Sequence, residues 1–180
     1  MDMTRLHNLM RTLILTVLAA ALPSAAWAQF GGGIGTKYSP YIISTTDHMT
    51  ELANNVNGGE RYFGKYFRLD ADLDYTGKTY TVIAALDNSN STPYFCGNFN
   101  GNGHTISGVQ LDKTTNSTVS VQVGLFGRTS YNVIENLTLS NSTIKARMHV
   151  GGIVGLSEGE TIRNCHVTSD VTIEVVHIFD

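Results

Sequence analysis

Residues 134–139 read Ile-Glu-Asn-Leu-Thr-Leu, and residues 162–167, 28 positions further on, read Ile-Arg-Asn-Cys-His-Val. Residues 106–111 (Ile-Ser-Gly-Val-Gln-Leu) precede the first of these segments by the same interval. The interval also relates residues 124–127 (Gly-Leu-Phe-Gly) to residues 152–155 (Gly-Ile-Val-Gly). A fixed period of this length, filled with strand-forming and turn-forming residues, is typical of stacked supersecondary units rather than of one globular core.

The repeated units read as short strands and turns without helices, so they predict an all-β fold. A single coil cannot bury its own apolar face, and coils of this kind must therefore stack. We expect a parallel β-helix, a solenoid with about 28 residues per coil. Three inward ladders are predicted from the period: Ile106, Ile134 and Ile162; Val109, Leu137 and Cys165; and Leu111, Leu139 and Val167.

Asparagines and glycines predict the corners of each coil. Asn136 and Asn164 lie where the apolar phase shifts, and Asn tolerates the left-handed conformation. Each could also form a hydrogen bond to its counterpart one coil away, and Gly108 is expected at the same bend in the first unit. The glycines of segments 124–127 and 152–155 predict a second tight corner.

The first 28 residues have the three parts of a signal peptide. Arg5 and Arg11 precede an apolar run over 13–22, which is too short to span a bilayer, and residues 26–28 (Ala-Trp-Ala) form a cleavage site. We expect cleavage before Gln29, which predicts an exported protein, secreted or on the cell surface, with no membrane span after cleavage.

The remaining chain divides into three predicted parts. Residues 29–36 are expected to be a flexible leader, 37–94 an N-terminal cap with the first strands, and 95–180 the β-helix repeats. One helix is predicted over 45–57, where an amphipathic stripe could cover the N-terminal end of the stack. No cap is expected at the C-terminal end, so the repeats either continue or stay uncapped, and this coil could self-associate.

Charge and cysteine content limit the partners. The chain carries a net charge of −3, and residues 29–180 carry −4 because the signal region contributes +1. An acidic chain without a basic run argues against nucleic acid and anionic membrane surfaces as partners. The register of Cys165 favours a small buried hydrophobe over a disulfide with Cys96, and neither cysteine has a histidine at zinc-ligand spacing.

No catalytic, cofactor-binding or metal-binding residue is predicted. The sequence contains no His-Glu-x-x-His motif. Asp70, Asp72 and Asp74 alternate as in the solvent face of a strand, and a calcium loop is excluded because Tyr75 and Thr81 stand where glycine and glutamate are needed. A β-helix that cuts polysaccharides would need clustered carboxylates and a basic residue, and the candidates are scattered: Asp112, Lys113, Glu135, Glu158 and Arg163.

Tyrosines are the best indication of a binding surface. Seven of the eight precede residue 95, namely Tyr38, Tyr41, Tyr62, Tyr66, Tyr75, Tyr80 and Tyr94. Exposed tyrosines could stack on sugar rings, but packing of the cap against the first coils is the favoured interpretation, because a tyrosine combines an apolar body with a polar tip.

The repeats resemble the GLUG-motif proteins, which are exported bacterial repeat proteins. The resemblance rests on residues 123–127 followed by 134–137, on 150–155 followed by 162–165, and on the upstream segment 99–106; it extends over residues 36–173. It implies a right-handed parallel β-helix at a cell surface or in secreted material. Such repeats occur in adhesin-like proteins and in non-catalytic regions of large secreted enzymes, including metallopeptidases that cleave immunoglobulin A.

We therefore expect an exported, non-enzymatic scaffold or adhesion module, with glycans or host and extracellular matrix proteins as partners. Weak contacts along an elongated face would suit multivalent binding. Two alternatives are a truncated N-terminal, non-catalytic region of a larger secreted enzyme such as a metallopeptidase, and a β-helix enzyme that cuts polysaccharides. The resemblance itself transfers no catalytic residues.

Overall fold

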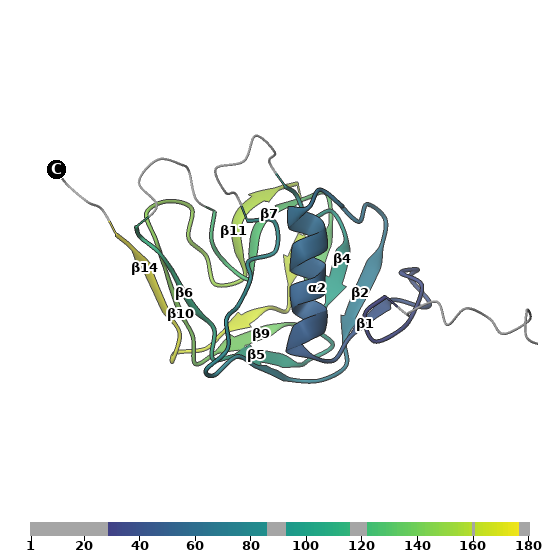
Figure 1. Cartoon of the computed structure of the whole chain (residues 1–180), viewed down its shortest axis with the longest axis horizontal. Helices are drawn as coiled ribbons and strands as arrows, with labels where there is room; N and C mark the ends of the chain where they lie inside the picture. Colours follow the sequence, from purple (N-terminus) through teal and green to yellow (C-terminus); the bar gives the residue numbers. More distant parts are fainter. Residues whose placement is uncertain (1–28, 86–92, 116–121, 160, 177–180) are drawn as a thin grey trace, which may run out of the picture.

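The computed structural model describes residues 29–85, 93–115, 122–159 and 161–176 (Figure 1). The predicted signal peptide lies outside these residues. The described residues form a parallel β-solenoid of about four turns, with about 29 residues per turn and a single short helix, which confirms the predicted all-β parallel β-helix. None of the helices in the described ranges is long and apolar enough to cross a membrane.

Parallel strands stack into four sheets along the solenoid. The five-stranded sheet has the order β1 (Tyr41–Ile43), β2 (Tyr66–Leu69), β4 (Asn98–Asn100), β8 (Val133–Glu135) and β12 (Thr161–Arg163). The four-stranded sheet has the order β13 (His166–Val167), β9 (Thr138–Ser140), β5 (Thr105–Ser107) and β3 (Leu73–Asp74). The two smaller sheets are formed by β14 (Thr172–Val175), β10 (Thr143–Ala146) and β6 (Gln110–Lys113), and by β11 (Val154–Glu158) and β7 (Phe126–Ser130).

The predicted ladders are correct in the last two coils and wrong in the first. Ile134 pairs with Ile162 and Leu139 with Val167, as the 28-residue period predicts. Ile106, however, pairs with Leu139, and Leu111 pairs with Ile144, each 33 residues further on. The partner of Ile134 in the preceding coil is Phe99. The register shifts because the coils differ in length. Twelve residues separate β6 from β7, whereas seven separate β10 from β11, and this difference of five lengthens the period from 28 to 33 residues.

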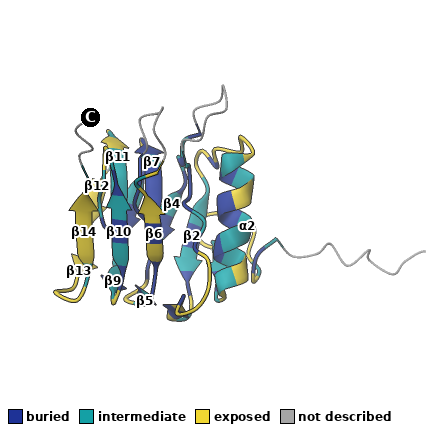
Figure 2. Ribbon diagram, turned by 60° about the vertical axis from the view of Figure 1, so that its left-hand side comes forward, coloured by how far each residue is buried: buried dark blue, intermediate teal, exposed yellow. Residues whose placement is uncertain are grey.

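The N-terminal end is covered by α2 (Thr46–Asn57), as predicted (Figure 2). The Thr45 side chain accepts a hydrogen bond from the backbone nitrogen of His48, which satisfies one of the free donors at the helix start. The buried stripe of the helix consists of Met49, Leu52, Ala53 and Val56. Burying this stripe protects the apolar end of the first coil from water.

The expected flexible leader is anchored to the core instead. Phe30 is buried, and its ring lies 5.2 Å from that of Tyr41 and 5.4 Å from that of Phe67. Gly31 donates a backbone hydrogen bond to the Ile42 carbonyl, and Ile42 donates one to the Gly32 carbonyl. The glycines made this segment look unstructured in the sequence, but one aromatic side chain and two backbone hydrogen bonds attach it to β1.

The C-terminal coil exposes apolar side chains that earlier coils bury (Figure 2). Ile162 is 44% exposed although its partner Ile134 is fully buried, and Val167, Ile173 and Val175 are similarly exposed. Cys165 is therefore half-buried rather than buried, and both cysteines are free. Self-association through this face stays a prediction.

The asparagine corner is confirmed. Asn136 and Asn164 have φ values of 55° and 51°. The Asn164 amide donates to Asn136 Oδ1 at 3.1 Å, and the Asn136 amide donates to Asn100 Oδ1 at 3.1 Å. The predicted equivalence with Gly108 is wrong, because the longer coil aligns Gly108 with Asn141, to whose carbonyl it donates a backbone hydrogen bond.

Replacing Asn136 with Ala is expected to destabilise the protein by about 2 kcal/mol, since it loses the amide ladder and strains a left-handed residue. Asn136→Gly is the matched variant, because it loses the same ladder but tolerates the positive φ, and about half the cost should remain. Urea unfolding of both variants measures the difference. Equal costs would contradict the role of backbone conformation at this corner.

Candidate functional site

The outer face of the five-stranded sheet carries two rows of polar and aromatic side chains. Strand residues alternate between the two faces of a sheet, so Phe67, Phe99 and Ile134 point into the core while their neighbours point outward. Strand pairing aligns the outward residues of successive coils. One row contains Arg68, Asn100, Glu135 and Arg163, and the other contains Tyr66, Asn98, Val133 and Thr161.

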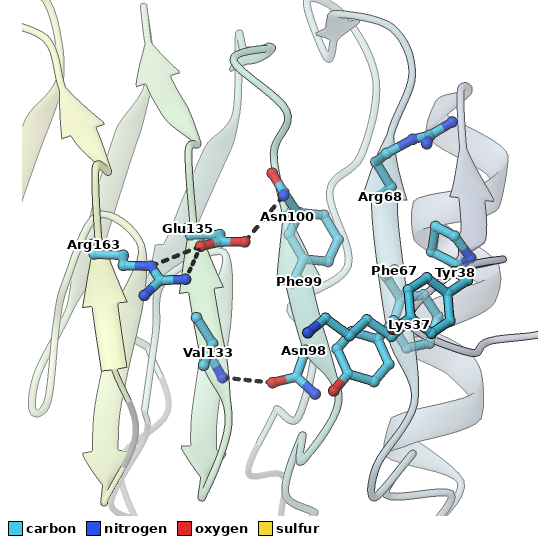
Figure 3. Close-up of a pocket in the computed structure, with 12 residues that line it drawn as sticks. Lys37, Tyr38, Phe67, Arg68, Asn98, Phe99, Asn100, Val133, Glu135 and Arg163 are labelled. Atoms are coloured by element: carbon cyan, nitrogen blue, oxygen red, sulfur yellow. Dashed lines mark hydrogen bonds and ion pairs between the residues drawn. The ribbon is translucent and has the colours of Figure 1, made fainter.

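A groove of about 430 Å³ lies over these rows (Figure 3). Its wall at the β1 end is formed by Lys37, Tyr38 and Pro40, which belong to the segment that enters β1. In Figure 3 the Lys37 side chain extends over the sheet toward Asn98, and Arg163 lies at the opposite edge. The groove therefore crosses several coils, and its wall depends on how the N-terminal segment is anchored.

Hydrogen bonds fix Glu135 at the centre of the first row. Its Oε2 accepts from Arg163, with distances of 2.7 Å to Nε and 2.6 Å to a terminal nitrogen, and its Oε1 accepts from the Asn100 amide at 3.0 Å. Hydrogen-bond donors thus engage both oxygens of this carboxylate. This geometry makes Glu135 a structural anchor of the row.

The cations of the groove differ in their pairing. Arg68 donates to both carboxylate oxygens of Asp70, at 2.7 and 3.0 Å, and this hydrogen bonding lowers the pKa of Asp70. Arg163 is paired with Glu135. Across the described ranges, no ion pair includes Lys37. Lys37 is thus the cation of the groove with its charge available to a ligand.

Five of the eight tyrosines fall into a buried group and a groove group. Tyr62, Tyr75 and Tyr80 are buried, and burial raises the pKa of each phenol, as the packing interpretation predicts. Tyr38 is 95% exposed, and Tyr66 is half-buried beside it in the groove. Within the groove, Tyr38 and Tyr66 are therefore the tyrosines available for stacking on a ligand.

The candidate residues for polysaccharide cleavage are not gathered into one site. Glu135 and Arg163 line the groove, but Asp112 and Lys113 lie on β6, and Glu158 lies on β11 with Arg128 as its ion-pair partner. The Asp112 carboxylate accepts hydrogen bonds from the side chain and backbone of Thr114, which lower its pKa. Glu135 is thus the single carboxylate among the described lining residues, and general acid–base hydrolysis of a glycoside normally uses two.

The three alternating aspartates each have a separate structural partner. Asp70 pairs with Arg68, Asp72 accepts from the backbone of Thr105 and contacts His104 Nδ1 at 3.0 Å, and Asp74 accepts from the backbone of Thr76. Within the part of the chain that the structure describes, no group of three or more His, Cys, Asp or Glu side chains is placed to hold a metal. The aspartates contribute to turns and coil contacts.

Four polar residues of the groove were not predicted from the sequence: Lys37, Arg68, Asn98 and Asn100. Tyr38 and Tyr66 were among the tyrosines considered as possible sugar contacts. The signal for the two asparagines was present, since both alternate with Phe99 in the segment 98–100. Neither Lys37 nor Tyr38 follows a strand period, so no pattern in the sequence places them over the sheet.

These features define a β-solenoid repeat protein with a polar groove on one outer sheet. The chain contains a GLUG motif: the sequence profile of the GLUG motif matches residues 146–172, which extend through β11, β12 and β13 to the first residue of β14. The resemblance to GLUG-motif repeat proteins is thereby confirmed.

Two curated relatives and one crystal structure are similar over most of the chain. Halomucin from Haloquadratum walsbyi is 32% identical over 150 residues, which are 78% of this chain and 2% of that protein. A protein from Evansella cellulosilytica, provisionally named a Gly-rich membrane protein, is 33% identical over 172 residues, which are 90% of this chain and 18% of that protein. The chain therefore spans a small part of the length of these relatives.

The crystal structure is of a protein from Bacteroides ovatus described as a candidate immunoglobulin A1 protease. It superposes with a TM-score of 0.58 at 22% identity, and the match covers 79% of this chain and 41% of that chain. At this identity the likeness establishes a common fold.

Proposed function

We propose that the protein is an exported, non-enzymatic adhesion or scaffold module that acts at the cell surface or in the extracellular space. The outer groove of the five-stranded sheet is its contact surface. The predicted signal peptide, the GLUG motif and the similarity to a Gly-rich membrane protein support this location. The observation that carries the proposal is the wall at Lys37 and Tyr38, which places an exposed aromatic ring and an available cation over a preformed polar sheet.

The chemistry of the groove favours binding over catalysis. A nucleophile or general base needs an oxygen that can approach the substrate, and both Glu135 oxygens are already held by Arg163 and Asn100. The exposed tyrosine and the amides can contact a ligand without chemical change. Such a surface gives weak single contacts, which become strong when many copies act together.

Replacing Tyr38 with Ala is expected to weaken binding about tenfold, because an exposed aromatic anchor contributes most of the contact energy at such sites. The measurement is binding of residues 29–180 to arrays of glycans and extracellular matrix proteins. Tyr131→Ala is the matched control, since Tyr131 is also strongly exposed but does not line the groove. Equal loss in both variants, or no loss in either, would refute the groove as the contact surface.

A second candidate function is a non-catalytic region of a larger secreted enzyme. The observation that favours it is the superposition on part of the candidate immunoglobulin A1 protease, of which this chain covers 41%. The intact mass of the protein recovered from cells and medium of its native producer is the test. A mass that matches residues 29–180 would exclude this candidate, and a much larger mass would support it.

A further inference from the structure

We infer that the groove binds a glycan that carries carboxylate groups, with Lys37 pairing the carboxylate and Tyr38 and Tyr66 contacting the sugar rings. This inference rests on the proposed function and names the ligand class of the same groove. It follows from three properties of the lining residues: their charge, their aromatic and amide groups, and the pairing of the strands beneath them.

The groove is lined by more cations than carboxylates, although the chain as a whole is acidic. Lys37, Arg68 and Arg163 line it together with one carboxylate, that of Glu135, although the whole chain carries a net charge of −3. A local excess of cations on an acidic protein attracts an anion to that place and repels it elsewhere. Arg68 and Arg163 already have carboxylate partners. Lys37 is therefore the cation that pairs with the carboxylate of the ligand.

Aromatic and amide side chains provide contacts that a sugar can use. Tyr38 and Tyr66 line the groove, and a tyrosine side chain combines an aromatic ring with a hydroxyl group. The Asn100 amide donates one hydrogen to Glu135, and its second amide hydrogen is available for a sugar hydroxyl. Asn98 also lines the groove. Its Oδ1 accepts a hydrogen bond from the backbone nitrogen of Val133.

The strands beneath the groove disfavour an extended peptide as the ligand. β2, β4 and β8 each pair with a strand on both sides, so their backbone groups cannot add a further strand. Among the apolar lining residues, Phe67 and Phe99 are almost completely buried and Pro40 and Val133 are half-buried, so the groove offers little apolar surface to a peptide anchor. A chain recognised through side-chain charge, amides and aromatic faces fits the groove better.

The test uses residues 29–180 and oligosaccharides built from galacturonate, mannuronate and glucuronate, measured by calorimetry at low and high salt. At least one of them should bind, and its methyl ester, with the same rings but no charge, should bind much more weakly. Lys37→Gln should weaken binding of the acid about fivefold and remove most of its salt dependence. Lys113→Gln removes the same charge on β6, outside the groove, and should leave binding unchanged.

Each other outcome overturns the inference in a distinct way. Equal binding of the acid and its methyl ester would exclude carboxylate recognition while leaving glycan adhesion intact. Equal binding of single-stranded DNA would indicate a general response to polyanions. If no uronate oligosaccharide binds but Tyr38→Ala still reduces binding to a matrix protein, the ligand class is wrong and the proposed adhesive function stands.

Discussion

Ile134→Asp is expected to unfold the solenoid at room temperature. The Ile134 side chain is fully buried between Phe99 and Ile162 in the central ladder. A carboxylate at this position would have no partner, because the neighbouring inward side chains are apolar. Burial of an unpaired charge costs about 4 kcal/mol or more, and a domain of this size has only about 5–15 kcal/mol of stability.

Ile162→Asp is the matched control for this prediction. It introduces the same change one coil further along the same ladder, where the side chain is 44% exposed and water can hydrate the new charge. Thermal unfolding followed by circular dichroism should show a folded protein with a slightly lower Tm. If Ile134→Asp melts like the control, the inward face assigned to β8 is wrong.

Gly127→Ala is expected to destabilise the protein by about 3 kcal/mol. A Cβ at this position would lie 2.4 Å from the Ala84 carbonyl oxygen and 2.9 Å from that of Gln122, both of them backbone atoms that cannot move aside cheaply. Overpacking of this kind normally costs about 1–3 kcal/mol, and contact with backbone places it at the upper end. Gly124, Gly151 and Gly155 have comparable backbone approaches.

Gly77→Ala separates the steric effect from the conformational one. Gly77 has a φ of 71°, but a Cβ added there would meet no atom within 4 Å, so its substitution should cost only about 1 kcal/mol. Chemical denaturation of the two variants gives the comparison. A smaller cost for Gly127→Ala than for Gly77→Ala would show that the backbone segments around Gly127 can move apart.

The glycine corner illustrates what the sequence reveals and what it conceals. The predicted corner is correct at Gly124 and Gly152, which lie at bends just before β7 and β11, and wrong at Gly127 and Gly155, which lie within those strands. None of the four glycines has a left-handed φ. They are required because neighbouring backbones approach closely, as at Gly127, or because a side chain does, as Val167 does at Gly152. The repeat shows at which positions glycine recurs. The close approaches that require glycine there are visible only in the packed structure.

The register of the ladders and the position of the groove could not be predicted from local sequence patterns, because both depend on contacts between distant residues. The Ile106 segment has the same pattern as the Ile134 segment, yet five extra residues in the corner after β6 move it to a different sheet. The outward rows of the groove follow from strand alternation once the register is known. The position of Lys37 and Tyr38 follows instead from the anchoring of Phe30 in an aromatic cluster, an interaction that the glycine-rich composition of this segment obscured.

The connection between β6 and β7 shows where the solenoid tolerates extra residues. It is five residues longer than its counterpart between β10 and β11, yet β7 and β11 pair in regular parallel register. Doubling the length of a flexible loop costs only about 0.6 kcal/mol in closure entropy. New recognition loops can therefore be grafted at this corner while the ladders retain their alignment, so surface diversity and core stability are largely independent in this molecule.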